Sequence, residues 1–185
     1  MSASYRPEFE AALHLFAQMS EEMAAQGYSR PVLVGGAAVE YYSQSAVSTG
    51  DFDVCTPRQQ AFETIMQRHG FIRPSGPGMA TRGWMHPELA LGFEIVASVP
   101  MDGSVDRDHI LLLEDFSDEG GFAIISVEDL IADRMCQYAS GTARDRLEQA
   151  RILLRLHPDA DMAYLERRIR EETGGDHGVE DIADG

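Results

Sequence analysis

Two neighbouring segments of this chain decide what it folds into. Residues 33–39 read Leu-Val-Gly-Gly-Ala-Ala-Val, and residues 48–54 read Ser-Thr-Gly-Asp-Phe-Asp-Val. Because side chains alternate between the two faces of a strand, we expect Asp51 and Asp53 on one face and Phe52 on the other. Two carboxylates that share one patch repel each other, and a divalent cation such as Mg²⁺ relieves that repulsion. The alternative is an Asp-rich turn, against which the strand character of the segment argues.

The glycine pair precedes this carboxylate pair. Gly35 and Gly36 follow a short apolar strand predicted at 32–34 and precede a helix predicted at 37–45. Glycines leave backbone amides unobstructed and a helix start carries partial positive charge, so this turn is suited to phosphate groups. The alternative is an ordinary tight turn. Ser48 and Thr49 either donate hydroxyl hydrogen bonds to phosphate or cap the turn.

Two further motifs lie in the C-terminal half. Residues 130–134 read Leu-Ile-Ala-Asp-Arg, and residues 144–148 read Arg-Asp-Arg-Leu-Glu. With the Gly-Gly turn and Asp-x-Asp, they resemble the polymerase-beta-like nucleotidyltransferase superfamily, in particular its small bacterial abortive-infection and toxin–antitoxin members. Those members carry Leu-Ile-Ala-(Asp/Glu)-Lys and (Arg/Lys)-Asp-x-x-(Asp/Glu) motifs. The matches together span residues 32–155.

The resemblance implies an α/β fold, with the mixed central sheet of the nucleotidyltransferase fold, flanking helices and C-terminal helices. It also implies Mg²⁺- or Mn²⁺-dependent transfer of a nucleoside monophosphate from a nucleoside triphosphate to an acceptor hydroxyl. Asp51, Asp53 and a third carboxylate would then be the catalytic and metal-binding residues. Our candidate is Glu94, because an unpaired carboxylate is costly to bury in its apolar strand, predicted at 91–99. Alternation equally permits an outward-facing surface position, and the family more often has aspartate there.

Arg134 stands where the family usually has lysine. A guanidinium can bind phosphate through two parallel hydrogen bonds, so the resemblance assigns Arg134 to the triphosphate. The alternative is a salt bridge with Glu128 or Asp133. Asp145 and Glu148, three apart on one helical face, either orient Arg134 or the nucleotide, or balance nearby arginines. The expected nucleotide-binding set is Gly35, Gly36, Ser48, Thr49, Arg134 and Asp145.

The composition limits the partners. The net charge is −16 and all 15 basic residues are arginine, which argues against broad binding to nucleic acid. The acidity favours solubility in a saline cytoplasm; the alternative is an acidic surface that recruits a cationic substrate such as an aminoglycoside. One group of arginines is either an ion-paired, solvated face or a surface for a polyanion such as the end of a transfer RNA. This group comprises Arg144, Arg151, Arg155, Arg167, Arg168 and Arg170.

At 185 residues the chain is expected to form one compact unit. We see neither a charged leader nor an apolar run long enough for a membrane span, and the two cysteines form no disulfide framework. We therefore expect a cytoplasmic protein. Cys55 either lines the site or is a buried small hydrophobe.

The pattern of apolar residues and capping signals predicts the remaining elements. We expect a nucleotidyltransferase core at 1–125, a helical portion packed on it at 126–173, and a disordered acidic tail at 174–185. Within these parts we predict helices at 7–27, 57–69 with a Thr56–Gln59 capping box, 126–140, 143–157 and 162–172, a hairpin of strands 110–113 and 122–125, and a loop at 73–83.

Three hypotheses follow for function. The first is the transferase, with a nucleoside triphosphate and an acceptor RNA, protein or small molecule as partners, and a cognate antitoxin if the protein is a toxin. The second is a non-catalytic relative that binds nucleotide or a partner protein. The third keeps the enzyme and makes an aminoglycoside-type antibiotic its acceptor.

Overall fold

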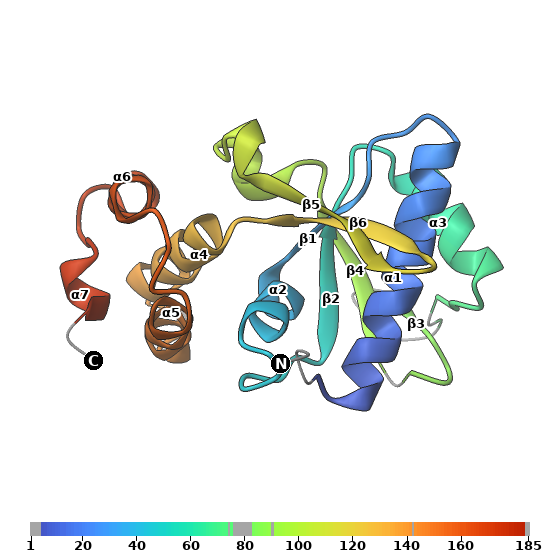
Figure 1. Cartoon of the computed structure of the whole chain (residues 1–185), viewed down its shortest axis with the longest axis horizontal. Helices are drawn as coiled ribbons and strands as arrows, with labels where there is room; N and C mark the ends of the chain where they lie inside the picture. The colour runs from blue at the N-terminus through green and yellow to red at the C-terminus, as the bar shows by residue number, and fades with distance from the viewer. Residues whose placement is uncertain (1–4, 74, 76–82, 90, 142, 184–185) are drawn as a thin grey trace.

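A computed structural model describes residues 5–73, 75, 83–89, 91–141 and 143–183. Within them, six strands form one mixed sheet in the order β3-β4-β2-β1-β6-β5 (Figure 1). The pairs β2/β4 and β1/β6 are parallel, and the other pairs are antiparallel. The predicted mixed α/β sheet is therefore confirmed. The strands are β1 (Val32–Val34), β2 (Asp51–Cys55), β3 (Trp84–Met85), β4 (Gly92–Ala97), β5 (Ile110–Ser117) and β6 (Gly120–Ile125).

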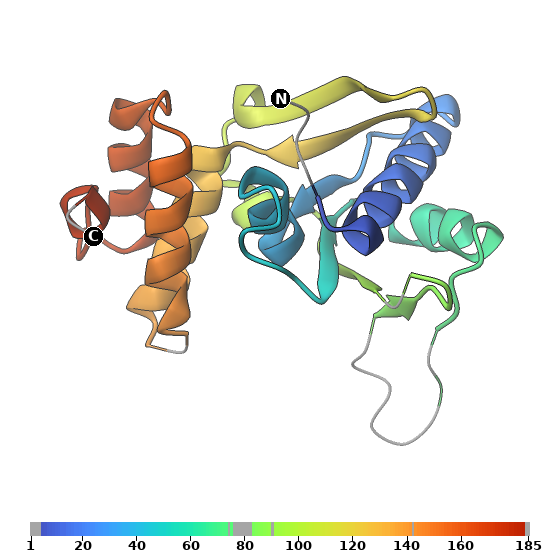
Figure 2. The ribbon, with the colours of Figure 1, turned by 60° about the horizontal axis from the view of Figure 1, so that its bottom comes forward.

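The helices flank this sheet in two groups. Helix α1 packs on β6 and α3, whereas α2 packs on β1 and β2 and contacts α4 and α5 (Figures 1 and 2). In the described part of the chain, no helix has the length and hydropathy of a membrane span. The helices are α1 (Pro7–Ala25), α2 (Gly35–Tyr42), α3 (Gln59–Arg68), α4 (Val127–Ala139), α5 (Asp145–Leu156), α6 (Met162–Glu172) and α7 (Glu180–Ala183), with 3₁₀ turns η1 (Pro100–Gly103) and η2 (Arg107–His109).

An aromatic cluster fills the core between α1 and the sheet. Phe52 and Phe93 are register partners on β2 and β4, and their rings stack at 4.5 Å between centroids. Phe16 of α1 contacts both rings edge-on or tilted. Burying one such side chain contributes about 1.5–3 kcal/mol. This face of the sheet therefore holds the fold together.

Some element boundaries differ from the predictions. Helix α2 starts at Gly35, so both glycines belong to its first turn. Helix α3 starts at Gln59, because the Thr56 hydroxyl accepts from the Arg58 amide at 3.2 Å and so closes a turn before the helix. The predicted Thr56–Gln59 capping box is therefore wrong. Most of the loop predicted at 73–83 lies outside the described residues.

The tail also differs from the expected disorder. Residues 174–183 form a turn and the short helix α7, which packs on α5. Ile182 is buried, and Arg170 Nη2 donates to Glu180 Oε1 at 2.6 Å. Buried Ile182, partly buried Val179 and paired carboxylates hold this segment against the helices, although its overall composition is acidic.

Candidate active site

The sheet face opposite the aromatic core carries the carboxylates. Asp53 on β2 and Glu94 on β4 are register partners, so they lie side by side, while Asp51 is two residues before Asp53 on the same face. Asp51 and Glu94 are exposed and Asp53 is half-buried. Burial raises the pKa of Asp53; the Gly36 amide and Arg134 oppose this rise, and Glu94 and Asp51 reinforce it. Of the two positions considered for Glu94, the structure shows the outward-facing one, beside Asp53.

The start of α2 approaches these residues closely. Gly35 has φ of +60°, and a Cβ there would collide with Asp53 Oδ2. The Gly36 amide donates to the same oxygen at 3.4 Å, and a Cβ on Gly36 would collide with Thr49 Oγ1. Both glycines are thus required by the approach of the helix to Asp53 and Thr49 and do more than make a turn.

A buried carboxylate that sequence analysis missed holds the loop before β2. Glu40 of α2 is fully buried and accepts from Arg6 Nε at 2.6 Å and from the Thr49 amide at 2.5 Å. Arg6 Nη2 also donates to the Thr49 carbonyl at 2.5 Å. The pair therefore fixes the backbone of Thr49 on both sides. The signal in the sequence was Glu40 itself, a charged residue directly after the apolar run Ala37–Val39.

A polar cavity of about 350 Å³ brings most of the predicted residues together. It lies between the start of α2, the loop before β2, β2 itself, α4 and α5. Among the predicted site residues, Gly35, Asp145 and Glu94 do not line it. Its lining comprises Gly36, Val39, Val47, Ser48, Thr49, Gly50, Asp51, Asp53, Arg134, Gln137, Arg146 and Gln149.

A second cavity of about 280 Å³ adjoins the first through Asp53, Arg134 and Gln137. Cys55 lines it, and burial raises the pKa of its thiol to about 11, so the group stays a thiol at neutral pH. Cys55 is therefore a buried small residue that also lines a cavity of the site. The other residues that line this cavity are Val34, Gly35, Val96, Ala97, Met101, Asp102, Ile125 and Asp133.

Arg134 lines both cavities and is nearly buried. Its Nε donates to Asp133 Oδ2 at 3.1 Å and its Nη2 contacts the same oxygen, so the salt bridge expected as an alternative forms with Asp133. Asp145 is exposed and pairs with Arg146 at 2.6 Å. From α5, Arg146 and Gln149 line the polar cavity, and the motif residue Asp145 does not.

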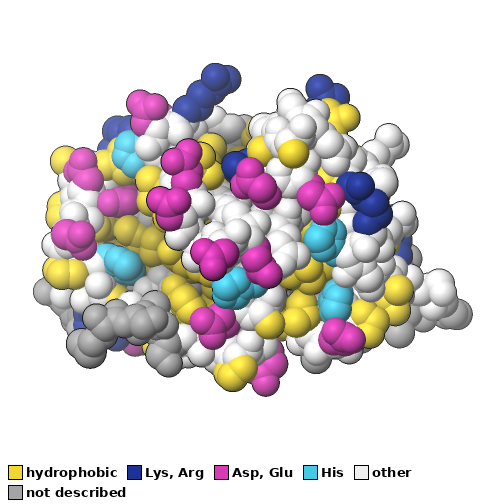
Figure 3. Space-filling view, turned by 45° about the vertical axis from the view of Figure 1, so that its right-hand side comes forward, with side chains coloured by type: hydrophobic (Ala, Val, Ile, Leu, Met, Phe, Trp, Pro, Cys, Tyr) yellow, Lys and Arg dark blue, Asp and Glu magenta, His cyan; other side chains and the backbone are white. Residues whose placement is uncertain are grey.

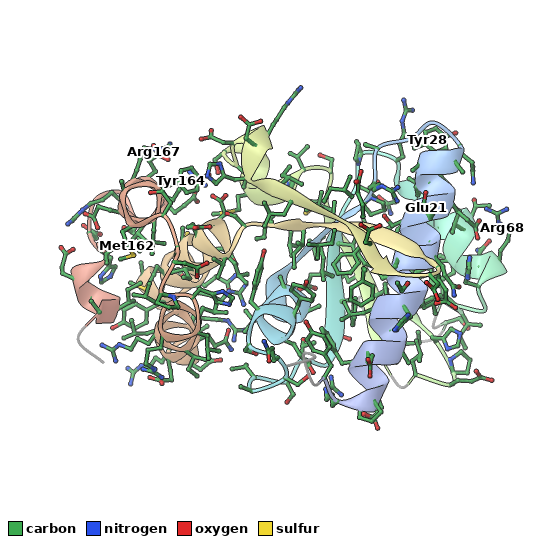
Figure 4. The ribbon with its side chains drawn as sticks, viewed as in Figure 1. Glu21, Tyr28, Arg68, Met162, Tyr164 and Arg167 are labelled. Atoms are coloured by element: carbon green, nitrogen blue, oxygen red, sulfur yellow. The ribbon has the colours of Figure 1, made fainter. Side chains whose placement is uncertain are left out.

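The arginines of α6 are ion-paired. Arg168 is buried and donates to Asp129 at 2.7 Å, and Arg170 donates to Glu166 at 2.7 Å. Arg167 pairs with Asp106 and lies over the ring of Tyr164 at 4.9 Å (Figure 4). These contacts correspond to the ion-paired alternative for this helix. The face in Figure 3 carries many carboxylates and few arginines, as the net charge of −16 implies.

The donor set suits a hard cation. Among the described residues, no group of three or more His, Cys, Asp and Glu side chains is arranged to hold a metal. Mg²⁺ commonly takes only one or two carboxylates and completes its shell with substrate phosphates and water. Asp51 and Asp53, beside a cavity whose wall includes a helix start and an arginine, fit that mode.

The fold is similar to that of a protein of known structure. No family model and no curated protein sequence matches the chain. An antigenic nucleotidyltransferase-like protein from Paracoccidioides brasiliensis superposes with a TM-score of 0.57 at 13% identity, over 94% of this chain and 90% of that chain. At this identity the similarity shows the fold: the chain has a nucleotidyltransferase-like fold, as the sequence motifs led us to expect. The narrower abortive-infection and toxin–antitoxin grouping stays a prediction.

Proposed function

We propose that this chain is a metal-dependent nucleotidyltransferase that moves a nucleoside monophosphate from a nucleoside triphosphate to an acceptor hydroxyl. One observation carries the proposal. A single polar cavity combines the glycine start of α2, two hydroxyl side chains, a carboxylate pair and Arg134. The nucleotidyltransferase-like fold adds an analogy only, because one fold hosts many functions, so the proposal rests on the cavity.

The cavity supplies complementary groups for a triphosphate. The start of α2 lines the cavity through Gly36 and carries partial positive charge, and Ser48 and Thr49 add hydroxyl groups. Arg134 adds a positive charge, and its guanidinium has five N–H donors, of which Asp133 accepts only those of Nε and Nη2. The Glu40–Arg6 pair keeps Thr49 in place beforehand, so less ordering is required when the nucleotide binds.

The carboxylates have separate roles in this proposal. Asp51 and Asp53 would hold the divalent cation. When bound, the cation supplies charge neutralisation for the displacement at phosphorus. Glu94 is the proposed acceptor of the proton from the attacking hydroxyl, and its exposed position beside Asp53 leaves it open to a substrate. The adjoining second cavity is the proposed place for the acceptor molecule.

The test is transfer of label from each α-labelled nucleoside triphosphate, with Mg²⁺ or Mn²⁺, to total RNA, lysate protein or an aminoglycoside panel. We expect one acceptor class to be labelled with release of pyrophosphate. The double variant Asp51→Asn, Asp53→Asn should lose transfer and stay folded, whereas the control Asp118→Asn, at the exposed turn between β5 and β6, should keep it. Transfer that survives the double change would refute the proposal, and nucleotide binding without any transfer would identify a non-catalytic relative.

The labelled class also separates the finer proposals. A labelled RNA or protein, with growth arrest on expression, would support a toxin that travels with an antitoxin. Resistance conferred on a sensitive host, with a labelled aminoglycoside, would support the antibiotic-modifying alternative. A cation attracted to the acidic surface would reach such a site faster at low ionic strength.

A further inference from the structure

We propose that Arg146 and Gln149 of α5 bind the nucleotide directly. Arg146 binds the terminal phosphate, and the side-chain oxygen of Gln149 accepts a hydrogen bond from the nucleoside. This inference rests on the proposed function and assigns the nucleotide contacts of α5 to residues outside the motif match. That match pointed instead to Asp145.

Helix α5 is placed so that Arg146 and Gln149 face the polar cavity. Arg146 and Gln149 are three residues apart, so they lie on one face of the helix. Both line the polar cavity together with Gly36 and Thr49. Helix α5 contacts α2 directly, on the side of the sheet away from α1 (Figure 2). The motif residues Asp145 and Glu148 each precede these positions by one and are both exposed, outside the cavity lining.

A chain of hydrogen bonds sets the direction of Arg146. Its Nε donates to Gln137 Oε1 at 3.0 Å. Gln137 Nε2 in turn donates to Asp133 Oδ2 at 3.0 Å, the oxygen that also accepts from Arg134. One bridging glutamine therefore ties together two arginines from α4 and α5, and both arginines line the same cavity.

The two arginines differ in how strongly their present partners hold them. The side chains of the Arg134–Asp133 pair are 4% and 26% exposed, whereas those of Arg146–Asp145 are 29% and 65% exposed. A solvent-exposed pair contributes little to stability and is readily exchanged. A guanidinium has five N–H donors, so Arg146 can keep Gln137 and replace Asp145 with a phosphate. Arg146 is thus the more exchangeable of the two.

Gln149 adds a different requirement. Its Oε1 is buried and has no hydrogen-bond partner in the described part of the chain, while its Nε2 donates to Asp145 at 3.3 Å. Buried amide oxygens in proteins almost always have a donor. Ionised phosphate oxygens are acceptors only, so a ligand that satisfies this oxygen does so through its nucleoside part. A ribose hydroxyl and a base amino group both meet this requirement.

The first experiment is calorimetric titration of the full chain with a nucleoside monophosphate, a diphosphate and a non-hydrolysable triphosphate, in Mg²⁺. Arg146→Gln should weaken triphosphate binding about tenfold and change monophosphate binding less than about twofold, as loss of one charge-assisted contact implies. The matched control Arg144→Gln, at the exposed start of the same helix, should bind like wild type.

The outcomes are distinguishable. If wild type binds no nucleotide, the proposed function fails and this inference fails with it. If wild type prefers the triphosphate and Arg146→Gln keeps the same preference, the inference about Arg146 is overturned while the proposed function stands. Unfolding midpoints of both variants equal to wild type would show that a lost preference is not a folding defect.

The second variant tests the nucleoside contact. Gln149→Met should weaken all three nucleotides by a similar factor of about five, because it removes a contact that does not involve the phosphates. Titration with 2′-deoxy and 3′-deoxy nucleotides identifies the donor. If the donor is a ribose hydroxyl, the analogue that lacks this hydroxyl should bind wild type and Gln149→Met equally weakly. If the donor is a base amino group, both analogues should bind wild type more tightly than Gln149→Met. Unchanged affinity in Gln149→Met would overturn this part.

Discussion

The two faces of strands β2 and β4 differ completely although they are built from alternating residues of the same strands. On one face, Phe52 and Phe93 stack at 4.5 Å in the core. On the other face, Asp53 and Glu94 lie side by side, and burial with like charges raises the pKa of Asp53. Phe52/Phe93 and Asp53/Glu94 are successive partner pairs in the register of β2 and β4. A change of register would shift both pairs, so the packing that fixes the phenylalanines also fixes the carboxylates. Adjacent substitutions should therefore separate stability from function.

The largest expected effect is on the aromatic face. Phe52→Ala removes a fully buried ring that contacts Phe93 and Phe16, and such truncations cost about 3–5 kcal/mol. Urea unfolding followed by circular dichroism measures the loss. A cost below about 1 kcal/mol would mean that this face does not hold the two strands together.

The next effect is on the polar face, one residue away. Asp53→Asn should reduce transfer by at least about 100-fold, the scale measured for loss of one transition-state stabiliser. Its unfolding free energy without metal should equal or exceed that of wild type, because the change removes a charge that burial disfavours. Initial rates and urea unfolding on the same preparation test both parts. Full activity, or a stability loss like that of Phe52→Ala, would contradict the division between the faces.

Glu40 sharpens the comparison because it lies on the site side of the sheet yet is buried like a core residue. Glu40→Gln weakens its pair with Arg6 and its bond to the Thr49 amide, and should cost about 1–3 kcal/mol. We also expect KM for the nucleotide to rise, since Thr49 lines the cavity. Glu8→Gln, at an exposed position of α1, is the control. An unchanged KM with lowered stability would restrict Glu40 to a purely structural role.

The smallest effect is the pH dependence of Asp53 in metal-free protein. Its folded pKa lies above the value of 3.8 for an unperturbed group. Its contribution to stability is therefore fully present below pH 3.8 and is lost as the pH rises through the folded pKa. The unfolding free energy of wild type relative to Asp53→Asn should fall over that window in the presence of a chelator. Parallel pH curves for the two proteins would contradict the raised pKa.

Local patterns were enough to predict the strand that carries the carboxylates. The alternation in Asp51–Val54 leaves only one arrangement that buries Phe52, and the Ser126–Asp129 cap predicted the start of α4, where the Ser126 hydroxyl accepts from the Asp129 amide. These features depend on neighbours within four residues, so the sequence specifies them directly.

Features that depend on distant partners could not be predicted. Glu40 finds Arg6 34 residues away, and nothing near Glu40 indicates that partner. Which side of α5 faces the cavity depends on how the helix packs against α2 and α4, so the motif pointed to Asp145 where the structure presents Arg146. Ile182 anchors the tail by contact with a separate helix, which its acidic composition does not reveal.

We propose that the polar face of β2 and β4 is a metal and nucleotide site. The most direct measurement is calorimetric binding of a non-hydrolysable nucleoside triphosphate to wild type and to Asp53→Asn, each with Mg²⁺ and with a chelator. We predict binding to wild type that requires Mg²⁺ and is lost in Asp53→Asn, while both proteins stay folded. Equal binding with and without Mg²⁺, or undiminished Mg²⁺-dependent binding by Asp53→Asn, would contradict it.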